Sequence, residues 1–332
     1  MLQTKKEKLE YYLNAFYSLG EKLNSQTPHT ISLNYNKHKG HIIFACLIHG
    51  NETGTLPAIL KCIKKLMNKE IHFGGKVSFL LGNIEAAKKG VRYLESDLNR
   101  CFGNNYVGKE TQERKRALEI MPILKTADVF IDFHQTIMPS LKPFYIFEMN
   151  RESYFWARAT GGATTLVTRK KGAQFSSAGM CSDEYVRSFQ KVGLTLELGE
   201  QGFSHEAESL AFEVMKRALK YMDQIYLNNF SIEKLCKKNN DFEFLSITYR
   251  EPFESPKKRL NEGFCNFHKI SKNMVVGSDQ LQNPLESPKE GYILFPKYPL
   301  RNQDGEAELP LPGEIYVLAT PTTEHPLNWQ QI

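Results

Sequence analysis

A run of seven consecutive apolar residues, at positions 42–48, constrains the fold of this chain more than any other feature. Uninterrupted apolar runs of this kind are typical of strands buried on both faces of a sheet. Two mostly apolar segments at residues 76–81 and 128–133 are also expected to be strands, and the segments 56–67 and 110–124 have helical periodicity. Strands that alternate with helices predict an α/β domain with a largely parallel sheet, whose functional site lies beyond the carboxyl ends of its strands.

The sequence predicts two domains. Helical periodicity at residues 5–23 and 206–226 flanks the alternating strands and helices, and we expect one domain over residues 1–230. Beyond residue 235 the pattern changes to short β-rich pieces separated by Pro, Asn and Gly. Residues 235–332 are therefore expected to form a smaller, β-rich domain. The length of 332 residues fits two domains of about 150 residues each.

Composition argues against several classes of protein. The formal net charge of +6 is small and dispersed, so we expect no nucleic-acid partner. No apolar run approaches the roughly 20 residues needed to cross a bilayer, and the amino terminus lacks the apolar segment of a secretion signal. We therefore expect a cytoplasmic protein without a membrane partner. The six cysteines contain no CxxC pair, which indicates free thiols.

Histidine and carboxylate side chains follow two of the predicted strands. The sequence His49-Gly-Asn-Glu52 comes directly after the first apolar run, and His134 follows the third. Zinc accepts imidazole and carboxylate ligands, and a catalytic zinc site uses three protein ligands with one position open. His49, Glu52 and His134 are therefore candidate ligands of one zinc ion. The spacing of the first pair also allows a structural interpretation, with a locally hydrogen-bonded histidine and a surface glutamate.

Four ordered motifs resemble one known family. The strings HGNETG, GVRYLESDLNRCFG, DFHQT and LTLELGE are similar to those of the succinylglutamate desuccinylase and aspartoacylase family of zinc-dependent amidohydrolases. The similarity is strongest over residues 41–203, and the string EGYILFP at 290–296 resembles the family's β-rich carboxyl-terminal domain. The resemblance implies a zinc-carboxypeptidase-like domain, with a mixed, largely parallel central sheet flanked by helices. It also implies that His49, Glu52 and His134 hold one Zn²⁺ per chain.

The resemblance assigns roles to further residues. Glu197, in the LELG string, matches the general base, and Arg92 matches the arginine that polarises the scissile carbonyl. Asn99 and Arg100 match the residues that hold a substrate carboxylate, which suits the planar fork of arginine. Structural interpretations stay open: a helix cap or an ion pair for Glu197, and a surface ion-pair turn for the DLNR string. Asp97 is expected to orient an arginine.

The region before Glu197 departs from the family pattern. Arg187 has the spacing of a second substrate-binding arginine in aspartoacylases, ten residues before Glu197, but Asp183 stands where a tyrosine is expected. The segment 170–188 partly resembles its desuccinylase equivalent but is longer, and it should line the acyl or amino-acid pocket. The identity of the substrate accordingly stays open, and a dicarboxylic N-acyl amino acid such as N-succinylglutamate is favoured.

Hydrolysis of the amide bond of a small N-acyl amino acid is the activity that these observations favour. Two alternatives remain: a carboxypeptidase-like peptidase on the same metal site, and a non-catalytic module that binds a metal ion or a small molecule. The complete ligand set together with Glu197 argues against the non-catalytic module. Turnover of acyl amino acids compared with short peptides would separate the two enzymes.

Overall fold

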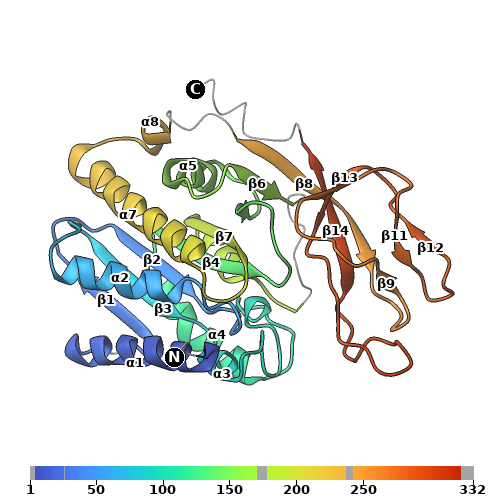
Figure 1. The fold of residues 1–332 in the computed structure, drawn as a ribbon. Coiled ribbons are helices and arrows are strands. Elements are labelled where there is room, and N and C mark those ends of the chain that lie inside the picture. The colour runs from blue at the N-terminus through green and yellow to red at the C-terminus, as the bar shows by residue number, and fades with distance from the viewer. Residues whose placement is uncertain (1–3, 26, 170–177, 237–241, 323–332) are drawn as a thin grey trace.

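One sheet runs through the described part of the molecule. The computed structural model describes residues 4–25, 27–169, 178–236 and 242–322. Within these residues eleven strands form a sheet in the order β1-β3-β2-β4-β7-β5-β6-β8-β14-β13-β10, and three strands form a second sheet in the order β12-β11-β9 (Figure 1).

The helices and strands have the following bounds. The helices are α1 (Lys5–Lys22), α2 (Leu56–Met67), α3 (Ile84–Lys89), the 3₁₀ helix η1 (Leu98–Arg100), α4 (Gln112–Leu124), α5 (Arg151–Thr160), α6 (Ser182–Arg187), α7 (His205–Asn228) and α8 (Ile232–Cys236). The strands are β1 (Thr30–Asn34), β2 (His41–Cys46), β3 (Lys76–Leu81), β4 (Val129–Thr136), β5 (Phe144–Ile146), β6 (Thr165–Thr168), β7 (Val192–Glu200), β8 (Glu243–Pro252), β9 (Arg259–Leu260), β10 (His268–Ile270), β11 (Val275–Ser278), β12 (Pro284–Glu286), β13 (Gly291–Leu294) and β14 (Glu314–Pro321).

The predicted α/β architecture is confirmed. β2 pairs in parallel with β3 and with β4, and β4 pairs in parallel with β7. β1 and β5 run antiparallel to β3 and β7, so the sheet is mixed but largely parallel in this part. The predicted helix over 56–67 coincides with α2, and the first predicted strand ends at Cys46, two residues earlier than the apolar run.

Alternate side chains of β2 enter different hydrophobic clusters. Ile42 and Phe44 pack with residues of α1, α2, α5 and α7, whereas Ile43 and Ala45 pack with residues of α4 and α6. Helices therefore cover both faces of the sheet around its parallel strands (Figure 1). Every residue of β2 is buried, which explains why the five residues after His41 in this strand are all apolar.

The carboxyl-terminal strands extend the same sheet. β8 pairs in parallel with β6, and β14 and β13 follow by antiparallel pairing (Figure 1). A hydrophobic cluster of this part includes Phe253, Ile293 and Ile315. The predicted β-rich carboxyl-terminal part is thus present. The boundary between residues 230 and 235 stays a prediction, because hydrogen bonds between β6 and β8 connect the two parts and residues 323–332 lie outside the described ranges.

In the ranges that the structure describes, no helix is both long and apolar enough to cross a bilayer.

Candidate metal centre

The candidate site lies where the central parallel strands end. β2, β4 and β7 run in the same direction, so their carboxyl ends meet at one edge of the sheet. His134 lies in β4 directly opposite Glu197 of β7, and His49 follows β2 by three residues. At Gly50 a Cβ atom would lie 2.3 Å from the backbone nitrogen of Ala87, so glycine lets the loop after β2 pack against α3.

Three buried side chains meet at this edge. Nδ1 of His49 lies 2.7 Å from Oε1 of Glu52, and Nδ1 of His134 lies 2.9 Å from Oε2 of the same carboxylate. The two Nδ1 atoms are 3.1 Å apart. One ligand atom from each residue lies within 4.8 Å of the others. The structure therefore brings together the three residues that the sequence singles out as metal ligands.

The donor set and its spacing fit a zinc ion. In a tetrahedral site with zinc–nitrogen distances of about 2.0–2.1 Å, two nitrogen ligands are about 3.3 Å apart. The 3.1 Å between the two Nδ1 atoms is close to that separation. Two imidazoles and one carboxylate leave a fourth coordination position for water or substrate.

Each imidazole directs its other nitrogen toward a carboxylate. Nε2 of His49 lies 3.0 Å from Oδ1 of Asp97. Nε2 of His134 lies 2.9 Å from Oδ2 of Asp132, although the two groups are not aligned as a hydrogen bond. The hydroxyl of Ser182 donates to the same Oδ2 at 2.5 Å. Carboxylates in these positions fix the tautomer and orientation of metal-binding histidines.

Electrostatics in the cluster favour a cation. Burial would raise the pKa of Glu52, but His49 and His134 hold it well below its usual range. Burial would lower the pKa of His134, but Asp132 and Glu52 raise it well above its usual value. Because a metal ion binds the neutral imidazole, a divalent cation at this cluster would compete with a proton for His134.

Glu197 is a buried carboxyl group in the middle of an apolar strand. Its Oε2 atom has no hydrogen-bond partner, and it forms no ion pair with any residue that the structure describes. Burial raises its pKa to about 8. Neither structural interpretation of this residue fits, because it caps no helix and pairs with no described cation. A carboxyl group that exchanges its proton near neutral pH suits general acid–base work.

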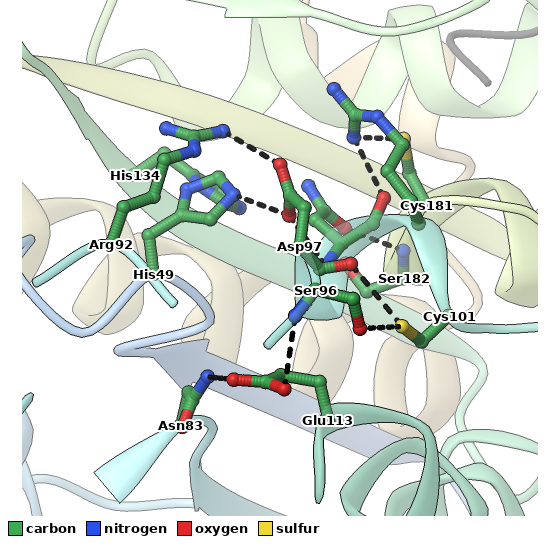
Figure 2. Close-up of polar contacts among 12 residues, drawn as sticks. His49, Asn83, Arg92, Ser96, Asp97, Cys101, Glu113, His134, Cys181 and Ser182 are labelled. Atoms are coloured by element: carbon green, nitrogen blue, oxygen red, sulfur yellow. Dashed lines mark hydrogen bonds and ion pairs between the residues drawn. The ribbon is translucent and has the colours of Figure 1, made fainter. Parts of the chain in front are cut away.

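Asp97 connects Arg92 to the histidine cluster. Nη2 of Arg92 donates to Oδ2 of Asp97 at 3.1 Å, while the other oxygen of Asp97 faces His49 (Figure 2). Nη1 of Arg92 also lies 3.5 Å from Oε1 of Glu52. Burial would raise the pKa of Asp97, but His49, Arg92 and Arg100 lower it. The predicted contact between Asp97 and an arginine is confirmed, and Asp97 contacts a candidate metal ligand as well.

Asn99 and Arg100 belong to the short helix η1, next to the start of α6. Oδ1 of Asn99 accepts from the backbone nitrogen of Ser182 at 2.9 Å. Nη1 of Arg100 donates to the backbone oxygen of Asn99 at 2.7 Å and lies 3.2 Å from Sγ of Cys181. The buried Glu113 supports the preceding loop, since its carboxylate accepts from the backbone nitrogen of Ser96 (Figure 2). It also accepts from the backbone nitrogen of Leu94.

A cavity of about 700 Å³ opens in front of the cluster. Seven of the nine residues to which the sequence assigns a role line it: His49, Arg92, Asp97, Asn99, Arg100, His134 and Glu197. Residues of the carboxyl-terminal part line the same cavity and include Arg250, Lys297 and Glu314. Glu52 and Arg187 are not among the lining residues.

Arg187 is not among the residues that line the cavity, and it forms an ion pair. Its Nη1 donates to Oδ2 of Asp183 at 2.5 Å and to the backbone oxygen of Gly193 at 2.8 Å. Asp183, four residues earlier in α6, does line the cavity, as does Cys181. These two residues belong to the segment 170–188 that was expected to line a pocket. Residues 170–177 of that segment lie outside the described ranges.

Comparison with known proteins identifies the family of this chain. The fold and site define an α/β protein with a candidate metal centre at the carboxyl ends of its parallel strands. Residues 39–225 match the family model described as succinylglutamate desuccinylase/aspartoacylase catalytic domain, which covers more than half of the chain. The chain belongs to this family of hydrolases.

Individual relatives and solved structures agree with this family. The succinylglutamate desuccinylase of Pseudomonas paraeruginosa strain DSM 24068 / PA7 is 27% identical over 269 residues, which cover 72% of this chain and 74% of that protein. The crystal structure of succinylglutamate desuccinylase from Vibrio cholerae has a TM-score of 0.65 at 16% identity, and the match covers 88% of this chain and 85% of that one. The corresponding structure from Chromobacterium violaceum has a TM-score of 0.64 at 17% identity, with 92% and 99% covered. At these identities the structures support the fold alone.

Proposed function

We propose that this protein is a zinc-dependent amidohydrolase that cleaves the amide bond of a small N-acyl amino acid, with a dicarboxylic substrate such as N-succinylglutamate favoured. The observation that carries the proposal is the buried His49–Glu52–His134 cluster, which faces a cavity beside the unpartnered carboxyl group of Glu197. Membership of the succinylglutamate desuccinylase/aspartoacylase family supports the reaction class. The substrate preference follows the name of the relatives that the chain matches.

His49, Glu52 and His134 would hold the zinc ion. When bound, zinc supplies a Lewis acid and lowers the pKa of a water molecule toward about 7. Asp97 and Asp132 hold the two imidazoles so that their Nδ1 atoms face Glu52.

Glu197 moves the proton in the proposed reaction. Its carboxylate accepts a proton from the attacking water and returns that proton to the departing amine nitrogen. The burial that raises its pKa to about 8 allows both transfers close to neutral pH. Its position opposite His134 in the β4–β7 pair places the acid at the edge of the cluster.

Two groups of residues would position the substrate. Arg92, held by Asp97, would donate N–H groups to the scissile carbonyl oxygen as negative charge develops there. Asn99 and Arg100 would bind a substrate carboxylate from the cavity wall. The role of Arg187 in substrate binding stays a prediction: its Nη1 binds Asp183 and the backbone oxygen of Gly193, and its buried Nη2 has no hydrogen-bond partner among the described residues.

Metal-dependent amine release tests the proposal. Chelated protein should not hydrolyse N-succinylglutamate, and one equivalent of zinc should restore the release of glutamate. His49→Ala should abolish hydrolysis, whereas His72→Ala, at an exposed histidine outside the cavity, should leave it unchanged. Hydrolysis by the His49→Ala protein would contradict the site. Cleavage of short peptides but not of acyl amino acids would indicate a peptidase, and zinc binding without any turnover would indicate a binding module.

A further inference from the structure

The carboxyl-terminal wall of the cavity carries an ion cluster that the proposed mechanism does not use. Lys297 follows β13, Glu314 begins β14 and Arg250 lies in β8, and all three line the cavity. Nζ of Lys297 donates to Oε1 of Glu314 at 2.5 Å. Nη1 of Arg250 lies 3.5 Å from Oε2 of the same carboxylate. One carboxylate is therefore shared between two cations that face the substrate space.

Lys297 lies deepest of these three side chains. Its side chain is 22% exposed, compared with 38% for Arg250. Burial lowers the pKa of Lys297, and the guanidinium groups of Arg92 and Arg100 act in the same direction, while Glu314 opposes them. Arg92, Arg100 and Lys297 all line the same cavity. An anion that enters the cavity would meet positive charge from all three side chains.

The surrounding backbone holds this wall in place. Proline residues at positions 296, 299, 310 and 312 line the cavity next to the ion cluster. Because proline fixes φ, these positions have little conformational freedom to lose when a ligand binds. The backbone nitrogen of Lys297 also donates to the oxygen of Ile315 at 2.9 Å, next to Glu314. The ammonium group is therefore presented from a constrained segment.

We propose that Lys297 is a substrate-specificity residue that binds a second carboxylate of the substrate, on its acyl group or its amino-acid side chain, distinct from the one that Asn99 and Arg100 would anchor. The inference rests on the proposed function and deepens it. In the absence of substrate, Glu314 binds the ammonium group of Lys297. The substrate carboxylate competes with Glu314 for this ammonium group. The wall thereby selects N-acyl amino acids with two or more carboxylates over those with one.

Two variants that break the same ion pair separate recognition from structural support. Lys297→Met removes the anion-binding group, whereas Glu314→Gln removes its internal competitor and keeps the ammonium group. Lys297→Arg restores the charge, and Lys272→Met is a matched control at an exposed lysine outside the cavity. The zinc-loaded full chain is assayed with N-succinylglutamate, N-butyrylglutamate and N-succinylglutamine. The second and third substrates each lack one carboxylate of the first.

We expect Lys297→Met to lower kcat/KM for N-succinylglutamate about tenfold or more, mainly through KM, because a hydrogen bond to a charged group is lost. One of the two analogues should change less than about threefold, and that analogue identifies the carboxylate that Lys297 binds. Glu314→Gln should raise kcat/KM for N-succinylglutamate. Lys297→Arg should recover most of the loss, and Lys272→Met should match the unmodified protein.

Two results would overturn the inference while leaving the proposed function intact. The first is an equal loss on all three substrates in Lys297→Met. The second is a loss in Glu314→Gln as large as in Lys297→Met, which would mean that the ion pair acts only as structural support. If the unmodified protein hydrolyses none of the three substrates, the proposed function fails, and the inference fails with it.

Discussion

Replacing Asp132 with asparagine should weaken zinc binding while leaving all three candidate ligands in place. Asp132 is fully buried, and its Oδ2 atom lies 2.9 Å from Nε2 of His134. Asparagine has the same shape, and its amide oxygen can still face Nε2, so the change removes mainly the negative charge. Loss of such a partner typically costs about 10- to 100-fold in metal affinity, which corresponds to about 1.4–2.7 kcal/mol.

The dependence on pH gives this prediction a second readout. Asp132 is the leading cause that raises the pKa of His134, so asparagine should lower that pKa. A proton would then compete less with zinc for His134 in the variant. The difference in affinity between the two proteins should therefore shrink as the pH falls.

Competition with a chromophoric zinc chelator measures these affinities. Asp128→Asn is a matched control, because Asp128 precedes the same strand but binds the backbone of His41 and the ammonium group of Lys191 far from the cluster. That variant should lose some stability but keep the zinc affinity of the unmodified protein. A folded Asp132→Asn protein with unchanged zinc affinity would refute the role of Asp132.

Three further predictions concern other buried groups. Glu197→Gln should lower kcat by about 10²- to 10⁴-fold with unchanged zinc content, and normal turnover in that variant would contradict its role. Because the pKa of His134 is raised, zinc affinity should increase with pH, and zinc binding should release a proton. Calorimetry in buffers of different ionisation enthalpy would detect the released proton. Zinc binding without proton release would argue against this role of His134. Burial, with a further contribution from Lys76, lowers the pKa of His41 to about 4, so the unfolded chain takes up the proton first as the pH falls below about 6.5. Up to about 3 kcal/mol of the free energy of unfolding should therefore be lost by pH 4. Urea unfolding at several pH values should show no such loss in His41→Asn. Parallel pH profiles of stability for the two proteins would disprove this prediction.

The sequence was sufficient to predict the parallel core and most of the candidate site. The apolar run at 42–48 and the segments that follow it determine strands that are buried on both faces. Because parallel strands end at one edge of their sheet, polar residues after β2 and within β4 and β7 had to converge there. The pairing of β4 with β7 places His134 opposite Glu197. Asp132 could also have been inferred, since residues two apart in a strand share a face.

Other parts of the site depend on contacts that local patterns do not encode. The spacing of Arg187 predicts a substrate-binding arginine, but it does not reveal the ion pair that Arg187 forms with Asp183, one helical turn earlier. Arg250, Lys297 and Glu314 belong to no motif and are separated by up to 64 residues. They meet because β14 pairs with β8 and carries Glu314 to the cavity. Such long-range pairing is set by the packing of the whole sheet, which the sequence pattern of a single strand does not reveal.

Anomalous diffraction from crystals of the zinc-loaded protein, recorded on both sides of the zinc absorption edge, would locate the metal directly. We expect one strong peak at about 2.0–2.2 Å from Nδ1 of His49, Nδ1 of His134 and a carboxylate oxygen of Glu52. An empty cluster, or a zinc ion bound only by other residues, would contradict the assignment of the metal centre.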